Sequence, residues 1–155
     1  MRPERTAWLT HTGSGMRGPA VLWGRLHAAI YRRTGGRVLP RWFGAPVMVL
    51  ETVGRRTGEP RSTPILYATR GDDLIVMPAN AGQDRAPAWW LNLRAAGEAS
   101  VVLKGKRRRV RPRLVRDDEH ADAWARYLDV YPAGEKYLSF TDREIPLVVL
   151  EPVDR

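Results

Sequence analysis

The chain has 155 residues, of which 43% are apolar and 28% are charged, a composition typical of a globular protein with one domain and its own core. It has no cysteine, and its three histidines lie far apart, which excludes disulfides, cysteine nucleophiles and zinc centres built on thiolates; we expect no metal site. The net charge of +9 favours an anionic partner, such as a phosphate-bearing cofactor, a nucleic acid or a membrane surface.

The positive charge is concentrated near the N-terminus. Residues 1–43 hold eight arginines and one glutamate, a charge of +7, which leaves +2 for residues 44–155. Arginine supplies 23 of the 26 cationic side chains, which is typical of GC-rich coding and indicates an actinobacterial source. No segment approaches the roughly 18–20 apolar residues that span a bilayer, and no signal-peptide core is present, so we expect a cytoplasmic protein.

The first elements along the chain are a flexible arm over residues 1–18 and a single domain over 19–155. From Pro19, apolar residues recur at helical spacing up to Gly35, which predicts a basic amphipathic helix. These apolar residues are Leu22, Trp23, Leu26 and Ile30. The helix either packs against the domain or lies on the anionic inner face of the plasma membrane, and the sequence leaves both alternatives open.

After Gly44 the pattern changes to short β-rich runs separated by turn residues. The predicted strands are Val47–Val53, Thr63–Thr69, Leu74–Ala79, Ser100–Leu103, Arg107–Val115 and Ile145–Leu150. Two helices are predicted, Ala86–Ala96 and Asp118–Tyr131; the second has Asp117 as N-cap and an apolar face of Ala121, Trp124, Ala125 and Leu128. This order favours a mainly β fold of the α+β class, a small barrel of about six antiparallel strands with peripheral helices.

The first candidate site is the turn between the first two strands, Gly54-Arg55-Arg56-Thr57-Gly58-Glu59-Pro60-Arg61. Three guanidinium groups within seven residues, next to glycines that expose backbone N–H groups, have the chemistry to hold a phosphate. A charged hairpin loop that only faces solvent explains the same residues, so this pattern alone does not decide.

The second candidate site is the segment Asn80–Leu93, a polar loop that runs into a tryptophan-rich helix. Pro87 near the helix start suits a helix N-terminus that lines a ligand site. Trp89 and Asn92 share one helix face, and Trp90 shares the next with Leu93. Both tryptophans also fit a purely structural role in the core.

Three other charged segments receive simpler interpretations. The strand around Val110 alternates apolar residues with Arg107, Arg109, Arg111 and Arg113, which favours a solvated face over an anion-binding stripe. His120 is interpreted as a surface residue at a helix start, and Asp142-Arg143-Glu144 as a turn with local ion pairing. No nucleic-acid partner is expected, because the tryptophans lie on helices among apolar neighbours.

Four ordered motifs resemble the deazaflavin-dependent nitroreductase family, which binds coenzyme F420. They are Gly54-Arg55-Arg56-Thr57-Gly58 with Pro60-Arg61 and Pro64; Pro87-Ala88-Trp89-Trp90-Leu91-Asn92-Leu93; Tyr131-Pro132; and Arg143-Glu144-Ile145-Pro146-Leu147-Val148-Val149-Leu150-Glu151-Pro152. The resemblance runs from about Trp23 to Pro152. It implies a split β-barrel in which reduced F420, rather than FMN, gives a hydride to a small organic acceptor.

The resemblance also implies the cofactor-binding residues. Three arginines match the basic positions that hold the anionic end of F420, Pro64 to Leu66 would pass beside the deazaflavin ring, and Met77 to Asn80 would lie across from it. The full set is Arg55, Arg56, Thr57, Arg61, Pro64, Ile65, Leu66, Met77, Pro78, Ala79, Asn80, Ala81, Gly82, Arg85, Pro87, Trp89 and Asn92. The role of Asn92 does not follow from the sequence.

The chain departs from the nitroimidazole-reducing members of that family on the acceptor side. Those members have a serine at the position of Ala79 and a tyrosine at that of Leu66, and neither replacement can donate a hydrogen bond. Tyr131 and Tyr137 match tyrosines that close over the acceptor, whereas an intermediate tyrosine is replaced in the Ala133-Gly134 stretch. We therefore expect a quinone rather than a nitroaromatic acceptor. The alternative function is that of a non-catalytic carrier of F420 or a flavin nucleotide. We expect the protein to be a monomer or a homodimer.

Overall fold

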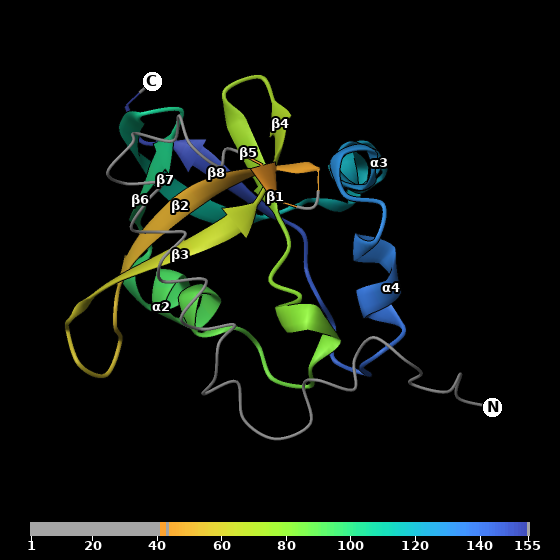
Figure 1. Cartoon of the computed structure of the whole chain (residues 1–155), viewed down its shortest axis with the longest axis horizontal. Helices are drawn as coiled ribbons and strands as arrows, with labels where there is room; N and C mark the ends of the chain where they lie inside the picture. Colours follow the sequence, from red (N-terminus) through yellow and green to blue (C-terminus); the bar gives the residue numbers. More distant parts are fainter. Residues whose placement is uncertain (1–40, 43, 155) are drawn as a thin grey trace.

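The computed structural model describes residues 41–42 and 44–154 (Figure 1). Its strands are β1 (Arg41–Trp42), β2 (Ala45–Val53), β3 (Pro60–Leu66), β4 (Ala68–Arg70), β5 (Asp73–Val76), β6 (Ala99–Leu103), β7 (Lys106–Leu114) and β8 (Val148–Pro152). Its helices are α2 (Ala88–Ala96), α3 (His120–Val130) and α4 (Gly134–Leu138), with 3-10 turns η1 (Asn80–Gly82) and η2 (Asp117–Glu119). The predicted flexible arm and the amphipathic helix from Pro19 lie outside the described residues.

The strands form a barrel whose pairings are all antiparallel. Neighbours follow the order β2-β6-β7-β8-β5-β4, and β3 pairs with the other edge of β2. Only Tyr67 separates β3 from β4, so one bent strand pairs with β2 before the bend and with β5 after it. Counting β3 and β4 as this single strand, and setting aside the two-residue β1, gives the six strands predicted; the split β-barrel is confirmed.

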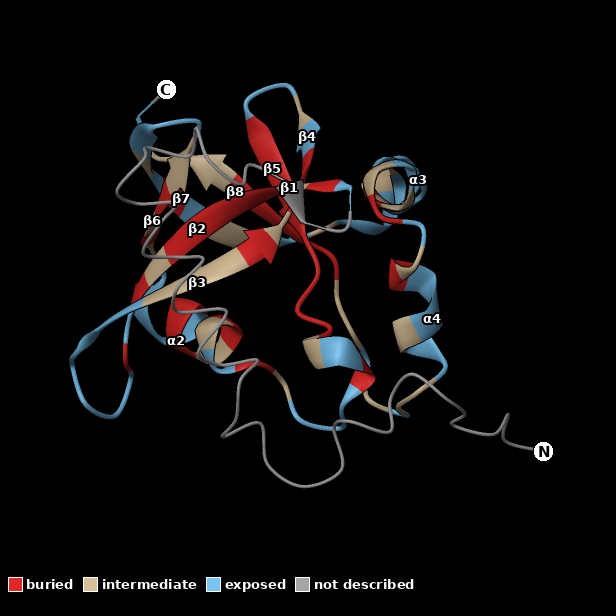
Figure 2. Cartoon of the chain, viewed as in Figure 1, coloured by how far each residue is buried: buried red, intermediate tan, exposed pale blue. Residues whose placement is uncertain are grey.

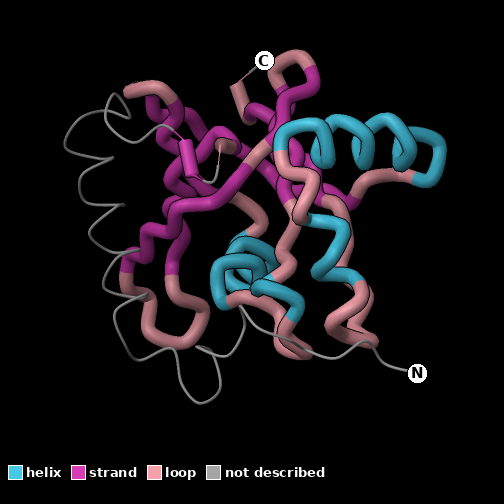
Figure 3. Tube along the Cα trace, turned by 45° about the vertical axis from the view of Figure 1, so that its right-hand side comes forward, coloured by secondary structure: helices cyan, strands magenta, loops and turns pink. Residues whose placement is uncertain are grey.

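Successive side chains of a strand point to opposite faces, so every second residue faces the inside of the barrel. These inward-facing residues form the barrel core. Met48, Leu50, Val101 and Leu150 are completely or almost completely buried there. Helix α2 packs against this core through Trp90 and Leu93. Figures 2 and 3 show α2 at one end of the barrel, while α3 and α4 lie along its side.

A second apolar cluster lies between the barrel and helix α3. It includes Ala123 and Tyr127, which are 0% and 3% exposed, whereas Ala121 and Ala125 are exposed. Of the predicted apolar face, Trp124 packs against this cluster as expected, but Ala121 and Ala125 do not. Their places are taken by Ala123 and by Tyr127, which contributes its ring to the core although its hydroxyl is polar.

The start of this helical region also differs from the prediction. Asp117 is not its cap; instead the Glu119 carboxylate accepts a hydrogen bond from the Arg116 backbone N–H at 3.0 Å. His120 is exposed and stacks on Trp124, as expected of a surface residue. Within residues 41–42 and 44–154, no helix has the length and apolar content that crossing a bilayer requires.

Candidate functional site

The turn between β2 and β3 is tightly closed by its own backbone. The Gly54 N–H donates to the Glu59 carbonyl at 2.8 Å, and the Gly58 N–H donates to the Gly54 carbonyl at 2.7 Å. A Cβ on Gly54 would lie 2.6 Å from the Thr57 hydroxyl oxygen, which itself accepts from the Glu59 N–H at 3.3 Å. This closure leaves the side chains of Arg55 and Arg56 exposed at the surface.

Asn92 connects this turn to helix α2. Its side-chain oxygen accepts two hydrogen bonds from Arg55, one from the backbone N–H at 3.1 Å and one from Nη1 at 3.2 Å. Asn92 is only 6% exposed, so these bonds form where water competes poorly. The buried amide therefore sets the position of the arginine turn, a role that the sequence pattern did not reveal.

Three of the four arginines at or near this turn have no carboxylate partner among the described residues. Within the described part of the chain, no carboxylate lies within ion-pair distance of Arg55, Arg56 or Arg85, and Arg61 shares the exposed Glu59 at 3.1 Å. Within the described residues, the positive charges of Arg55 and Arg56 in the turn, and of Arg85 just before α2, thus have no carboxylate beside them.

The arginines of β7 show the opposite arrangement. Arg107 pairs with Glu51 at 2.8 Å, Arg109 donates to Glu98 at 2.6 Å, and Arg113 contacts Glu119 and Glu151. Arg109 and Arg111 share Glu98, and the buried Nε of Arg108 has no hydrogen-bond partner among the described residues. Most arginines of β7 are thus ion-paired, which agrees with the solvated face expected for this strand and differs from Arg55 and Arg56 of the turn.

The segment after β5 has an unusual backbone. Asn80, Ala81 and Gly82 all have positive φ, at 49°, 53° and 74°. For an alanine such as Ala81 this conformation costs roughly 1–2 kcal/mol, whereas asparagine tolerates it, and such backbone is concentrated at functional sites. The Asn80 side-chain amide partly holds it by donating to the Arg85 carbonyl at 2.8 Å.

Two tyrosines form a hydroxyl pair beside that segment. The oxygens of Tyr131 and Tyr137 are 2.8 Å apart, and either can be the donor. Burial, followed by the hydrogen bond to Tyr131, raises the pKa of Tyr137 above that of an ordinary phenol. The structure thus brings together the expected acceptor residues and part of the expected cofactor set, because Leu66, Met77 and Ala79 belong to the same apolar cluster.

Four residues outside the predicted set of site residues belong to this cluster or contact the segment beside it. Tyr127 is buried against it, and a Cβ on Gly134 would lie 3.0 Å from the Tyr127 ring. Phe140, Thr141 and Arg143 contact the segment around Gly82. Local ion pairing was the wrong interpretation for Arg143, whose hydrogen bonds run instead to distant backbone carbonyls. The motif Arg143–Pro152 was the only sequence signal that marked this region.

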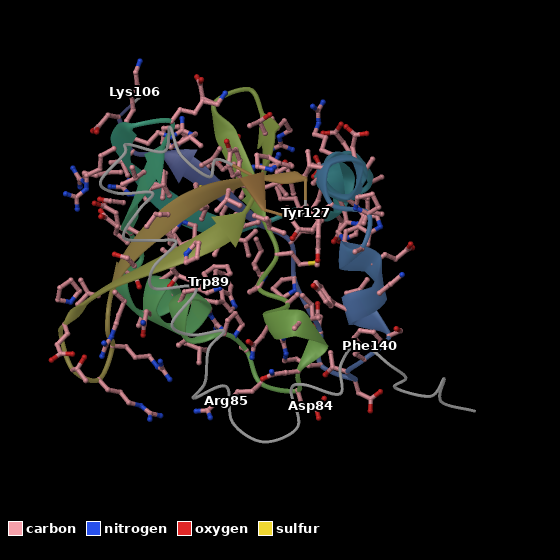
Figure 4. All side chains as sticks on the ribbon, in the orientation of Figure 1. Asp84, Arg85, Trp89, Lys106, Tyr127 and Phe140 are labelled. Atoms are coloured by element: carbon pink, nitrogen blue, oxygen red, sulfur yellow. The ribbon has the colours of Figure 1, made fainter. Side chains whose placement is uncertain are left out.

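The two tryptophans of α2 separate into different environments. Trp90 is 6% exposed and belongs to the barrel core, whereas Trp89 is half-buried and meets Trp90 edge to face, with ring centroids 6.2 Å apart. Figure 4 shows Trp89 at helix α2, below β3. Trp89 packs against the barrel core from the surface of this helix, which also carries Asn92.

A surface cavity of about 470 Å³ lies elsewhere, beside the other face of α2. None of the predicted site residues lines it, and its apolar and charged lining residues come mostly from α2, β7 and the segment before β8. They are Trp90, Arg94, Gly97, Pro112, Arg113, Leu114, Glu144 and Pro146. The candidate site is therefore argued from the charged turn, Trp89 and the tyrosine cluster.

Comparison with known proteins gives concordant results. A family model described as F420H(2)-dependent quinone reductase matches residues 23–152. The F420H(2)-dependent quinone reductase Rv1261c of Mycobacterium tuberculosis is 37% identical over 131 residues, which cover 81% of this chain and 87% of that protein. Its mycobacterial source agrees with the actinobacterial composition.

Two solved structures share the fold. The F420-H2 dependent reductase FDR-A has a TM-score of 0.62 at 24% identity, over 68% of this chain and 94% of that chain. A structure described as a domain-swapped dimer has a TM-score of 0.64 at 22% identity, over 86% of this chain and 100% of that chain. At these identities the likeness supports the split-barrel architecture.

Proposed function

Because the chain belongs to the F420H(2)-dependent quinone reductase family, we propose that it transfers a hydride from reduced F420 to a small quinone, with the anionic end of the cofactor held at the β2–β3 turn. The observation that carries this proposal is the contrast between two sets of arginines. Arg55, Arg56 and Arg85 lack carboxylate partners in the described part of the chain, and Arg61 pairs with the exposed Glu59. By contrast, Arg107, Arg109 and Arg113 of β7 pair with glutamates.

The donor set of the turn fits the chemistry of the cofactor. F420 has a phosphodiester and an oligoglutamate tail, which require cations and exposed N–H groups. Arg55 and Arg56 project such cations, and Asn92 holds the turn in place through hydrogen bonds of 3.1 and 3.2 Å. The neighbouring cluster around Leu66 and Met77 is apolar, as a flat ring system requires.

When bound, reduced F420 supplies the hydride. The residues of this chain have three roles in the proposal. Arg55 and Arg56 bind the anionic end, and Trp89 together with Leu66 covers the ring and excludes water. Tyr131 and Tyr137 provide hydroxyls to the acceptor oxygen that gains charge.

The acceptor side favours a quinone. Ala79 and Leu66 have no hydrogen-bond donor, so they cannot contact a nitro group as a serine and a tyrosine would. The hydroxyl pair of Tyr131 and Tyr137 retains one proton that is not used within the pair, because one hydroxyl donates to the other. That remaining donor suits a carbonyl oxygen that becomes a quinolate.

Oxidation of reduced F420 by menadione, followed as the absorbance of oxidised deazaflavin returns, tests the proposal. A reductase shows enzyme-dependent turnover that saturates in both substrates. A carrier binds F420, detected by fluorescence titration, without accelerating its oxidation by the quinone. FMN in the same titration should bind much more weakly, since it lacks the oligoglutamate tail. Tight FMN binding with no F420 binding would contradict the proposal.

We also propose that the basic N-terminal region attaches the protein to an anionic membrane surface. Its support is the +7 charge of residues 1–43 and the helical spacing of Trp23 and Ile30. Changing Trp23→Glu and Ile30→Glu together should abolish co-sedimentation with vesicles that contain anionic lipid, at unchanged secondary structure by circular dichroism. Loss of the fold would show instead that this segment packs against the domain.

A further inference from the structure

Arg143 lies between α4 and β8 and reaches the strained segment that follows β5. Its Nη2 donates to the carbonyls of Pro78 and Ala79 at 3.2 and 3.1 Å, and its Nε donates to that of Gln83 at 3.3 Å. The acceptors lie 60 to 65 residues earlier in the chain. One guanidinium therefore holds both ends of η1, which a planar group with five N–H donors does better than an ammonium.

A second contact reinforces this attachment. The Thr141 hydroxyl donates to an Asp84 carboxylate oxygen at 2.7 Å and accepts from the Arg143 backbone N–H at 3.0 Å. The residues just after α4 thus bind Asp84, just after η1, through a contact between two side chains. Because Arg143 and Thr141 hold different groups of the segment 78–84, this segment is attached at more than one point.

The η1 segment also packs against the C-terminal end of α4, the helix that carries Tyr137. A Cβ on Gly82 would lie 2.7 Å from the Cβ of Phe140 and 3.0 Å from the Tyr137 carbonyl oxygen. The rings of Tyr137 and Phe140 meet edge to face, with centroids 6.4 Å apart. The η1 segment, Phe140 and Tyr137 are therefore in continuous contact, and Figure 4 shows Phe140 beside η1.

These contacts explain how η1 keeps its conformation. Asn80 and Ala81 both have positive φ, which asparagine tolerates but alanine disfavours, so at Ala81 the conformation persists only where surrounding groups determine it. The carbonyls before and after these two residues are the ones that Arg143 binds. Removal of the guanidinium would release the segment toward ordinary backbone conformations.

We propose that Arg143 is a positioning residue, which fixes the segment 78–83 against the cofactor ring and ties it to the acceptor-side helix α4. This inference rests on the proposed function for its catalytic consequence, but the attachment itself is a property of the cofactor-free chain. It gives Arg143 a specific role in place of the local ion pair that its neighbours Asp142 and Glu144 suggested.

The test combines Arg143→Ala, Arg143→Lys and Thr141→Val with Arg126→Ala as the matched control, because Arg126 pairs with Asp122 on α3 and with no other carboxylate among the described residues. In cofactor-free protein, hydrogen exchange of the amides of 79–83 should accelerate at least about tenfold in Arg143→Ala and less in Thr141→Val. Arg143→Lys should restore part of the protection. The control should match the wild type.

The kinetic arm uses reduced F420 and menadione. Arg143→Ala should raise the KM for reduced F420 and the dissociation constant of F420 about tenfold or more, with a smaller change in the KM for menadione. Wild-type exchange and wild-type F420 affinity in Arg143→Ala would overturn the inference. If Arg143→Ala does not fold, Thr141→Val decides by the same exchange measurement. Wild-type protein that neither binds nor oxidises reduced F420 would refute the proposed function, while the exchange data would still decide the attachment.

Discussion

The side-chain oxygen of Asn92 accepts both the backbone N–H and a guanidinium N–H of Arg55, a residue 37 positions earlier in the chain. A buried amide on α2 thereby holds an exposed cationic turn between two barrel strands. Neither bond involves a charged acceptor, so the positive charge of Arg55 stays available to an anionic ligand. Asn92 therefore orients the turn, and Arg55 supplies the positive charge that would bind an anion.

Asn92→Ala should therefore affect stability and cofactor affinity together. It removes both acceptor interactions and leaves the Arg55 N–H without its partner, which costs about 1–3 kcal/mol for a buried group. Asn92→Asp keeps the acceptor but neutralises one cation, so it should retain more stability while still weakening F420 binding. Thermal denaturation and fluorescence titration measure the two effects. Wild-type Tm and affinity in Asn92→Ala would contradict the assigned role.

Removal of the turn arginines should weaken binding of F420 without unfolding the barrel. In Arg55→Ala/Arg56→Ala the dissociation constant should rise roughly tenfold or more, with a weaker dependence on salt, because two charge-assisted contacts are lost. Arg61→Ala should have a smaller effect, since Glu59 already shares that charge.

The matched control for the turn is Arg107→Ala/Arg109→Ala, which removes the same charge from β7. Those arginines already have glutamate partners, so F420 affinity should remain within about twofold of the wild type. An equal loss in both double variants would show that net charge alone, and not the turn, determines binding.

The sequence predicted the barrel well, because alternating apolar residues and glycine turns report strand faces directly. The bend at Tyr67 was missed, since Thr63–Thr69 reads as one continuous strand and the bend depends on which strand pairs with each half. The face of α3 was predicted correctly at Trp124 but missed Tyr127, because a tyrosine counts as half polar in any pattern.

The positions that orient the candidate site were the hardest to predict. Asn92 acts on a backbone N–H and a guanidinium of a distant turn, and Arg143 acts on backbone carbonyls, which every residue has. No residue type at the receiving end marks such contacts in a sequence. The cationic turn itself was visible, because its charges are local and consecutive.

Glu119 should make the stability of the barrel sensitive to acid. Its carboxylate contacts Arg70, Arg113 and Arg116, and the hydrogen bond from Arg113 is the main reason that its pKa falls from 4.5 to about 2. A carboxyl with a depressed folded-state pKa stabilises the fold above its unfolded pKa, and this contribution is lost as the pH falls from about 4.5 to about 2.

Glu119→Gln should accordingly lower the Tm at pH 7, and the difference from the wild type should shrink as the pH approaches 2. Asp118→Asn is the control, because Asp118 is exposed and its one ion pair within residues 41–42 and 44–154 is with Arg116, at 3.3 Å. Thermal melts between pH 2 and pH 7 measure both variants. A Tm difference that stays constant across this range would refute the link to the ionised carboxylate.

The hydroxyl pair of Tyr131 and Tyr137 should determine turnover rather than cofactor affinity. In the pair one hydroxyl donates to the other, and the second keeps a proton for the acceptor oxygen. Tyr→Phe at one of the two positions should lower kcat with menadione by roughly tenfold or more and leave the F420 dissociation constant unchanged. Tyr127→Phe, a buried tyrosine of the same cluster, serves as the control and should keep kcat within about twofold.

The pair should also behave as a unit. Because each hydroxyl orients the other, the double variant Tyr131→Phe/Tyr137→Phe should be little worse than the more damaging single variant, rather than the product of the two. Burial raises the pKa of Tyr137 above its ordinary value of 10, so this phenol stays protonated throughout the neutral range, and kcat should show no loss from its ionisation between pH 7 and about pH 10. Two single variants with wild-type kcat would mean that solvent or a backbone N–H stabilises the quinolate. A decrease in kcat accompanied by an equal loss of F420 affinity would instead assign the tyrosines to cofactor binding.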